Sequence, residues 1–185
     1  IVHVENTIEQ LKSGGIILYP SDTIWGLGCD ATNDEACQRI HELKERPANK
    51  SFIVLVDGFP MLERYVPDFN PVCYELADLA TRPLTIIYPS AKGLAPSVLA
   101  EDGTVGIRIT TDVNCLKLIR SIRKPIVSTS ANVSGQLSPT CFNEIAPTIK
   151  NGVDAILEDR LTEKMITPSQ IIKIGLDGSV TVIRK

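Results

Sequence analysis

Three cationic side chains fall within seven residues of the sequence. Lys44, Arg46 and Lys50 lie at the end of a predicted helix and just before a predicted strand. A planar guanidinium and compact ammonium groups both suit phosphate oxygens, so one interpretation is a polyphosphate site. The alternative is structural, because the helix dipole stabilises cations at a helix C-terminus. The stretch alone leaves both interpretations open.

A second stretch is rich in hydroxyl and amide groups. It follows an apolar strand predicted over residues 126–128, and it contains Ser128, Ser130, Asn132 and Ser138. Neutral donors and acceptors at this density could orient a nucleotide without adding charge. The alternative is a hydrophilic loop that ends at Thr140 as a helix N-cap.

A third polar stretch, residues 19–31, follows a strand predicted over residues 15–19. Asp22 and Thr23 come first, and Gly26 and Gly28 come next. Open α/β sheets bind ligands at the carboxyl ends of their strands, which favours a ligand-binding loop. Glycine and aspartate are also ordinary turn residues, so a tight turn is the alternative.

Arg108 lies near the end of an apolar strand predicted over residues 105–109, just after Thr104. Arginine is rarely buried without a partner, so this side chain either reaches the surface or meets an anion. Ser169 lies in the segment 167–170, which has little predictive value by itself.

Short β-branched runs alternate with helical patterns along most of the chain. We expect strands over residues 15–19, 52–56, 84–88, 105–109, 126–128 and 155–157, and a C-terminal hairpin over 170–174 and 179–183. Helices are expected from a Thr32–Glu35 capping box to about residue 45, from Asn70 as N-cap through residue 80, and over 112–122. This order predicts an α/β (mixed α+β) fold with one twisted sheet of parallel and antiparallel strands, covered by helices, in a single domain over residues 1–185.

The composition excludes several classes of protein. Hydrophobic residues make up 43% and charged residues 22%, which is typical of a globular protein. No apolar run reaches the roughly 18 residues of a membrane span, and no signal peptide is visible, so we expect a cytoplasmic protein. The net charge of −3 and the pI near 5.4 argue against a generally basic nucleic-acid-binding surface. Five scattered cysteines and only two histidines favour neither disulfides nor a bound structural metal.

Five motifs in this order resemble the YrdC (TsaC) family. They are Tyr-Pro-Ser-Asp-Thr at 19–23 with Gly-Leu-Gly at 26–28, Lys-Glu-Arg-Pro at 44–47, Pro-Leu-Thr at 83–85, Thr-Val-Gly-Ile-Arg at 104–108, and Ser-Ala-Asn-Val-Ser-Gly-Gln-Leu-Ser-Pro-Thr at 130–140. The resemblance spans residues 14–169 and is to the short form, without the additional C-terminal domain of longer members.

The resemblance implies a nucleotidyltransferase that makes L-threonylcarbamoyl-AMP and pyrophosphate from L-threonine, bicarbonate and ATP. The product would serve the threonylcarbamoyladenosine modification of tRNA and pass to a tRNA-modifying complex. Such a reaction depends on positioning and charge neutralisation rather than on a covalent nucleophile. Mg²⁺ would be held mainly by the ATP phosphates, with no protein metal site.

The motif positions also imply which residues bind the substrates. Contacts to threonine are expected from Thr23, Arg108, Ser128 and Ser169. Contacts to ATP are expected from Lys44, Arg46, Lys50, Thr104, Ser130, Asn132, Ser138 and Arg184. Lys44 and Arg46 would act by positioning. We assign no general base; Asp22 is a candidate whose alternative role is to cap its loop.

The chain departs from the family pattern at three places. Trp25 replaces a tyrosine and would preserve an aromatic wall, Leu55 stands where many relatives have a histidine, and Lys50-Ser51 replaces an Asn-Pro pair. The alternative function is an RNA-binding module of the same fold that contacts tRNA or double-stranded RNA through its cations and makes no adenylate. The acidic pI and the lack of an interleaved aromatic platform argue against it.

Overall fold

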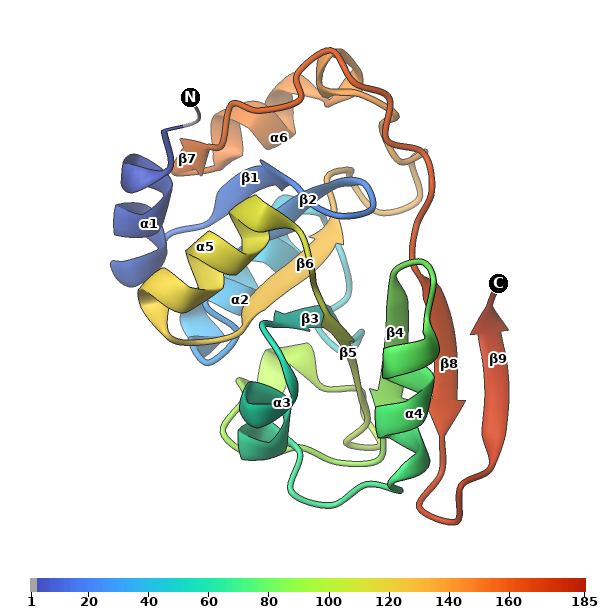
Figure 1. Ribbon diagram of the computed structural model, residues 1–185. Helices are drawn as coiled ribbons and strands as arrows, with labels where there is room; N and C mark the ends of the chain where they lie inside the picture. The colour runs from blue at the N-terminus through green and yellow to red at the C-terminus, as the bar shows by residue number, and fades with distance from the viewer. Residues whose placement is uncertain (1–2) are drawn as a thin grey trace.

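The computed structural model describes residues 3–185, which build one mixed sheet with helices packed against it (Figure 1). The described strands are β1 (Ile17–Pro20), β2 (Trp25–Gly28), β3 (Ile53–Val56), β4 (Leu84–Tyr88), β5 (Val105–Ile109), β6 (Ile126–Ser130), β7 (Ala155–Ile156), β8 (Gln170–Ile174) and β9 (Val180–Arg184). Their order across the nine-stranded sheet is β7-β1-β2-β6-β3-β5-β4-β8-β9. The pairs β1–β7, β3–β5 and β4–β8 are parallel and the other pairs are antiparallel. The predicted mixed sheet is therefore confirmed.

The helices of the described chain pack around this sheet. They are α1 (Glu5–Lys12), α2 (Asp34–Leu43), α3 (Phe59–Tyr65), α4 (Val72–Leu79), α5 (Val113–Ile122) and α6 (Pro147–Gly152), with short 3₁₀ turns η1 (Pro96–Val98) and η2 (Phe142–Glu144). Helices α1, α3 and α6 were not expected from the sequence, because they are short and have no side-chain cap at their first turn. Within residues 3–185, no helix is both long and apolar enough to cross a membrane.

The predicted capping box at the start of α2 is wrong. Asn33 is the N-cap, and its side chain accepts a hydrogen bond from the Ala36 N–H at 3.1 Å. The Thr32 hydroxyl instead donates to Asp30 at 2.7 Å. Two neighbouring residues could each serve as the cap, and the pairing of Thr32 with Asp30 decides between them.

Residues 25–28 form a buried strand rather than a glycine-rich loop. β2 pairs antiparallel with β1, and all four of its residues are buried. Gly28 is needed here because a Cβ at this position would lie 2.6 Å from the Tyr19 ring and 2.6 Å from the Val127 carbonyl oxygen. The two glycines thus mark close packing between strands and not a flexible binding loop.

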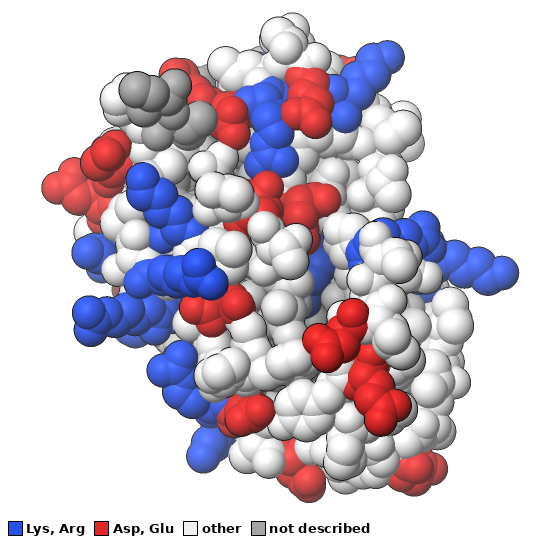
Figure 2. All heavy atoms as spheres, viewed as in Figure 1, with Lys and Arg blue, Asp and Glu red and all other residues white. Residues whose placement is uncertain are grey.

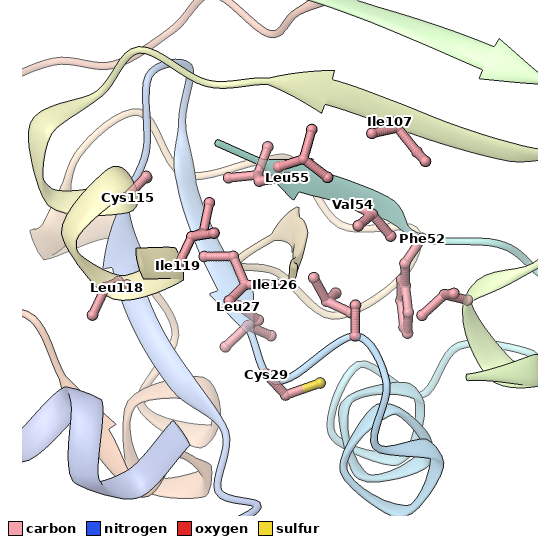
Figure 3. Packing of buried hydrophobic residues seen from close by; sticks show 14 of the residues in the cluster. Leu27, Cys29, Phe52, Val54, Leu55, Ile107, Cys115, Leu118, Ile119 and Ile126 are labelled. Carbon is pink, nitrogen blue, oxygen red and sulfur yellow. The ribbon is translucent and has the colours of Figure 1, made fainter. Parts of the chain in front are cut away.

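The core between α5 and the sheet fixes the strands that reach the candidate site. Figure 3 shows Cys115 and Ile119 of α5 beside Leu55 and Ile126 of the sheet, and all four side chains are completely buried. Burying such apolar side chains stabilises a fold by roughly 1.5–3 kcal/mol each. This packing holds β3 and β6 rigidly at the centre of the sheet.

We expect Gly28→Ala to lower the free energy of unfolding by about 1–3 kcal/mol, because the new methyl group overpacks the contact between Tyr19 and Val127. Chemical denaturation measures this loss. Gly58→Ala is the matched control and should cost less, because the nearest atom to its added Cβ is 3.7 Å away. Equal effects of the two substitutions would contradict the packing argument.

Candidate functional site

A cavity of about 400 Å³ opens where strands from both halves of the sheet meet. Strand register aligns Gly26 of β2 with Ser130 of β6, and Ser128 of β6 with Ile53 of β3. On the neighbouring strands β5 and β4, Arg108 is paired with Thr85. Segments 138–140 and 165–169 complete the cavity wall. The cavity therefore gathers side chains that are far apart in the sequence.

Eight of the twelve side chains that the motifs assigned to ligand binding line this cavity. They are Thr23, Arg46, Arg108, Ser128, Ser130, Ser138, Ser169 and Arg184. The other four, Lys44, Lys50, Thr104 and Asn132, do not line it. The structure thus brings most of the predicted residues together, and the ligand that each of them binds stays a prediction.

Arg108 is the most deeply buried cation of the site, with 2% of its side chain exposed. Its Nη2 donates to Asp22 Oδ1 at 2.9 Å, and longer contacts of 3.5 Å reach the hydroxyls of Thr85 and Thr23. Its Nε has no partner among residues 3–185. A buried guanidinium that keeps an unused donor can accept a second anion.

Arg184 lies next to this arginine. Its Nε donates to the Ser169 carbonyl oxygen at 2.8 Å, and the Ser169 hydroxyl is 2.8 Å from the Thr85 hydroxyl. Burial lowers the pKa of Arg184, and the positive charge of Arg108 lowers it further. We call Asp22, Thr23, Thr85, Arg108, Ser169 and Arg184 the Arg108 cluster. Two guanidiniums with a single carboxylate in this cluster favour an anionic ligand.

The cations near residue 44 lie on a helix cap. The Arg46 N–H donates to the His41 carbonyl oxygen at 2.9 Å and the Glu45 N–H to that of Glu42 at 3.0 Å, which is the Schellman pattern. Glu45 adopts φ 50°, the left-handed conformation that this cap requires. The reversal at Glu45 lets Lys44 and Arg46 leave the helix end in different directions.

Lys44 holds the hydroxyl-rich loop in place. Its buried amine donates to both the backbone and the side-chain oxygens of Ser130 and Asn132. The Asn132 amide in turn donates to the carbonyl oxygens of Val133 and Gln136, at 3.1 and 2.8 Å. Burial, and secondly the nearby Arg46, lowers the pKa of Lys44 to about 8.

Arg46 is supported by an aromatic ring. Its guanidinium carbon lies 4.9 Å from the centre of the Phe52 ring, and Phe52 stacks on His41 at 4.0 Å. Burial lowers the pKa of Arg46, and its Nη1 has no partner in the described part of the chain. Lys44 and Arg46 together form what we call the Lys44–Arg46 cap. Because Arg46 rests on Phe52, its guanidinium is preorganised toward the cavity.

Several features of the site were not apparent from the sequence. The hydroxyl of Thr85 is completely buried within the Arg108 cluster, and the Pro-Leu-Thr motif was the available signal for it. No sequence motif pointed to the cavity residues Met165 and Ile166. They line the cavity because the segment before β8 passes along its wall.

The aromatic wall expected from Trp25 is absent from the cavity surface. Trp25 is completely buried and packs on Phe142 with ring centres 5.2 Å apart. Leu55 is also completely buried and lies beside Arg108 in the strand register. Both departures from the family pattern therefore change the interior beneath the site rather than its surface.

The cavity residues of the described chain include no carboxylate, and Asp22 contacts the cavity only through Arg108. Within residues 3–185, no three His, Cys, Asp or Glu side chains lie close enough together to hold a metal ion. The cavity therefore offers cations and hydroxyl groups, the combination that binds carboxylates and phosphates.

The nine-stranded mixed sheet covered by helices places the protein in the α/β class, and similarity to known proteins specifies the family. The Sua5/YciO/YrdC family, described as telomere recombination, matches residues 9–185. The chain belongs to this family.

Named relatives share the sequence and the fold. A threonylcarbamoyl-AMP synthase of Pseudoalteromonas translucida is 35% identical, with 94% of this chain and 93% of that protein covered. The structure of P. abyssi Sua5 complexed with L-threonine matches with a TM-score of 0.87 at 26% identity, covering 96% of this chain. The chain spans only 52% of the length of that Sua5. E. coli YciO shares the fold, with a TM-score of 0.82 at 22% identity over 98% of this chain and 88% of YciO.

We expect Glu45→Gly to raise the free energy of unfolding by about 0.5–1 kcal/mol, because glycine adopts the left-handed conformation without steric cost. Glu42→Gly, in the regular part of α2, should instead destabilise by about 1 kcal/mol. Thermal or chemical denaturation distinguishes the two variants. Destabilisation by both would show that Glu45 contributes contacts that outweigh its backbone strain.

Proposed function

We propose that this protein is a threonylcarbamoyl-AMP synthase, which joins L-threonine, bicarbonate and ATP and releases pyrophosphate. One observation carries the proposal: a single cavity brings together two separate groups of cations, the Arg108 cluster and the Lys44–Arg46 cap, with the hydroxyls of β6 also on its wall. An amino-acid carboxylate and a polyphosphate are two anions of the kind that these groups attract. The synthase name of the 35% identical relative supports the same function.

The Arg108 cluster fits the threonine. In this proposal Arg108 binds the α-carboxylate, because its guanidinium is buried and keeps a donor without a partner in the described chain. Arg184 lies beside Ser169 in the same cluster, so we now place it at the threonine rather than at the ATP. Thr23 and Ser169 supply hydroxyls that can orient the amino acid.

The Lys44–Arg46 cap fits the nucleotide. Arg46 lines the cavity and would contact the phosphates. Lys44 would hold Ser130 and Asn132 in position through hydrogen bonds and add its positive charge. Ser130 and Ser138 present polar groups on the same wall. Lys50 and Thr104 do not line the cavity, so contacts from them to ATP would have to be made outside it.

Reaction in this site would depend on alignment and charge. The amine of threonine first reacts with bicarbonate to form a carbamate, with loss of water. A carbamate oxygen then attacks the α-phosphorus of ATP, and pyrophosphate leaves. Arg46 would stabilise the negative charge that builds on the phosphates, and Arg108 would hold the amino acid in line for attack. Asp22 accepts a hydrogen bond from Arg108 at 2.9 Å, which supports a role as its ion-pair partner rather than as a general base.

Magnesium would enter this proposal as part of the ATP substrate. The cavity residues of the described chain include no carboxylate, and no three His, Cys, Asp or Glu side chains within residues 3–185 lie close enough together to hold a metal ion. Mg²⁺ commonly keeps several water ligands and binds through substrate phosphates, which agrees with such a cavity. Bound Mg²⁺ would supply additional charge neutralisation at the phosphates.

The proposal includes a cytoplasmic setting and delivery of the product to a tRNA-modifying complex. Figure 2 shows Lys and Arg side chains gathered beside α5, with Asp and Glu side chains interspersed elsewhere on the same face. That face therefore carries no continuous basic surface of the kind that binds RNA backbones. Direct binding of tRNA or double-stranded RNA is treated as an outcome of the test and not as a second function.

The deciding assay measures pyrophosphate release by the purified protein. We expect release only when ATP, L-threonine and bicarbonate are all present, and L-serine in place of L-threonine serves as a matched control for the amino acid. Threonine-independent ATP hydrolysis would contradict the proposal. Tight RNA binding without any turnover would also contradict it and would favour the RNA-binding alternative.

The pKa of Lys44 predicts how ATP binding depends on pH. In the free protein this pKa is lowered to about 8, and a bound polyphosphate should raise it, because a nearby anion favours the charged amine. ATP binding should therefore take up a proton near pH 8, and the affinity should fall as the pH rises above about 8.

Calorimetric titration with ATP in buffers of different ionisation heat measures this proton uptake. Lys44→Gln should abolish it, whereas Lys50→Gln, at an exposed position outside the cavity, should retain it. Uptake that persists in Lys44→Gln would assign the proton to another group.

A further inference from the structure

One arginine outside the predicted set lies in the segment that closes the cavity. Residues 157–169 run from the β7 edge of the sheet to the start of β8, along the top of the molecule in Figure 1. The segment contributes Met165, Ile166, Pro168 and Ser169 to the cavity wall. We call it the crossing segment. Arg160 lies near its beginning and does not line the cavity.

Arg160 joins the crossing segment to the turn between β1 and β2. Its Nη1 donates to the Ser21 carbonyl oxygen at 3.0 Å, and its Nη2 donates to that of Pro20 at 3.0 Å. Nη2 also lies 2.9 Å from Asp112 Oδ1, and Nε lies 3.6 Å from Asp159 Oδ2. One guanidinium of the crossing segment therefore contacts the turn, its neighbour Asp159 and Asp112, the N-cap of α5.

The turn held by Arg160 carries part of the Arg108 cluster. The Ser21 hydroxyl donates to the Ile24 carbonyl oxygen at 2.8 Å and accepts from the Thr23 N–H at 3.1 Å. These bonds set the position of Thr23 on the cavity wall and of Asp22 beside Arg108. A change in the backbone at Ser21 would thus reach both residues directly.

Arg160 adopts a backbone conformation that a large side chain rarely takes. Its φ is 50°, in the left-handed region where only glycine avoids a steric cost. A residue held in such a conformation persists because its surroundings determine it, here through four polar contacts of one side chain. The side chain therefore contributes enough to outweigh the backbone preference for glycine.

We propose that Arg160 is a positioning residue that fixes the threonine-binding end of the cavity by tying the crossing segment to the Ser21–Thr23 turn. The proposal deepens the proposed synthase function and rests on it for the identity of the substrate. Arg160 acts through Asp22 and Thr23 on one side and through the segment that carries Ser169 on the other.

The variant Arg160→Gly separates the side chain from the backbone strain, because glycine tolerates φ 50° and makes none of the contacts. Arg123→Gly is the matched control. Arg123 also has a left-handed backbone, with φ 58°, but it is exposed at the end of α5 and lies outside the cavity. Both variants relieve the same kind of strain, and only the first removes the link to the turn.

The first measurement is amide hydrogen exchange, which requires no activity. Arg160→Gly should speed exchange in residues 21–24 and in the crossing segment by about tenfold or more, since charge-assisted bonds to the turn are lost. Exchange in β3 and β5 should stay unchanged. Arg123→Gly should leave residues 21–24 as protected from exchange as in the unchanged protein. If these residues also keep their full protection in Arg160→Gly, the proposal is overturned.

The second measurement is steady-state pyrophosphate release. Arg160→Gly should raise the KM for L-threonine about tenfold while the KM for ATP stays within about twofold, because the Lys44–Arg46 cap is untouched. Arg160→Lys keeps the charge without the planar guanidinium, so its KM for L-threonine should lie between those of the unchanged protein and of Arg160→Gly. A purely structural loss of folded protein would lower kcat and leave both KM values unchanged, which would also overturn the proposal.

The two measurements distinguish failure of this proposal from failure of the proposed function. If the unchanged protein releases no threonine-dependent pyrophosphate, the synthase function fails, and the exchange data still test the link made by Arg160. If exchange increases in the turn while the KM for L-threonine is unchanged, the positioning role is overturned although the synthase function stands.

Discussion

The burial of Arg108 is the constraint on which the site depends. A guanidinium that is 2% exposed is costly unless a carboxylate and further hydrogen-bond acceptors surround it. The Asp22 carboxylate at 2.9 Å supplies the charge, and the hydroxyls of Thr23 and Thr85 lie within 3.5 Å. These partners come from the β1–β2 turn and from β4, so satisfying one buried charge brings both halves of the sheet to the cavity. One further donor of this guanidinium, its Nε, has no partner in the described chain.

The other end of the cavity is built from a helix end rather than from a strand. The left-handed Glu45 reverses the chain, so that Lys44 turns inward to the oxygens of Ser130 and Asn132 while Arg46 lies over Phe52. A helix C-terminus already favours nearby positive charge, which lowers the cost of crowding two cations there. The helix cap thus holds Lys44 and Arg46 in place, as the structural interpretation of this stretch expects. Arg46 also lines the cavity, and its binding of an anion stays a prediction.

Short-range patterns predicted most strands of the sheet, and the motif positions of the family resemblance predicted eight of the residues that line the cavity. The runs of residues 84–88, 105–109 and 170–174 coincide with β4, β5 and β8, because the β-branched and apolar residues that favour a strand are local information. β2 was missed because Gly26 and Gly28 resemble turn residues, and only the Tyr19 ring packed against Gly28 explains them as strand residues. The role of Lys44 could not be predicted either, since its oxygen partners lie 86 and 88 residues away in the sequence. The left-handed Arg160 was missed for the same reason, as the turn that it holds is 139 residues distant.

The central claim is that one cavity holds two anions at two separate groups of cations. Equilibrium binding of ATP and of L-threonine to Arg46→Ala and Arg184→Ala tests it most directly. The account predicts that Arg46→Ala weakens ATP binding by about tenfold or more with little change for L-threonine, and that Arg184→Ala does the reverse. Equal losses of both ligands in both variants, or unchanged affinity for ATP in Arg46→Ala, would contradict it.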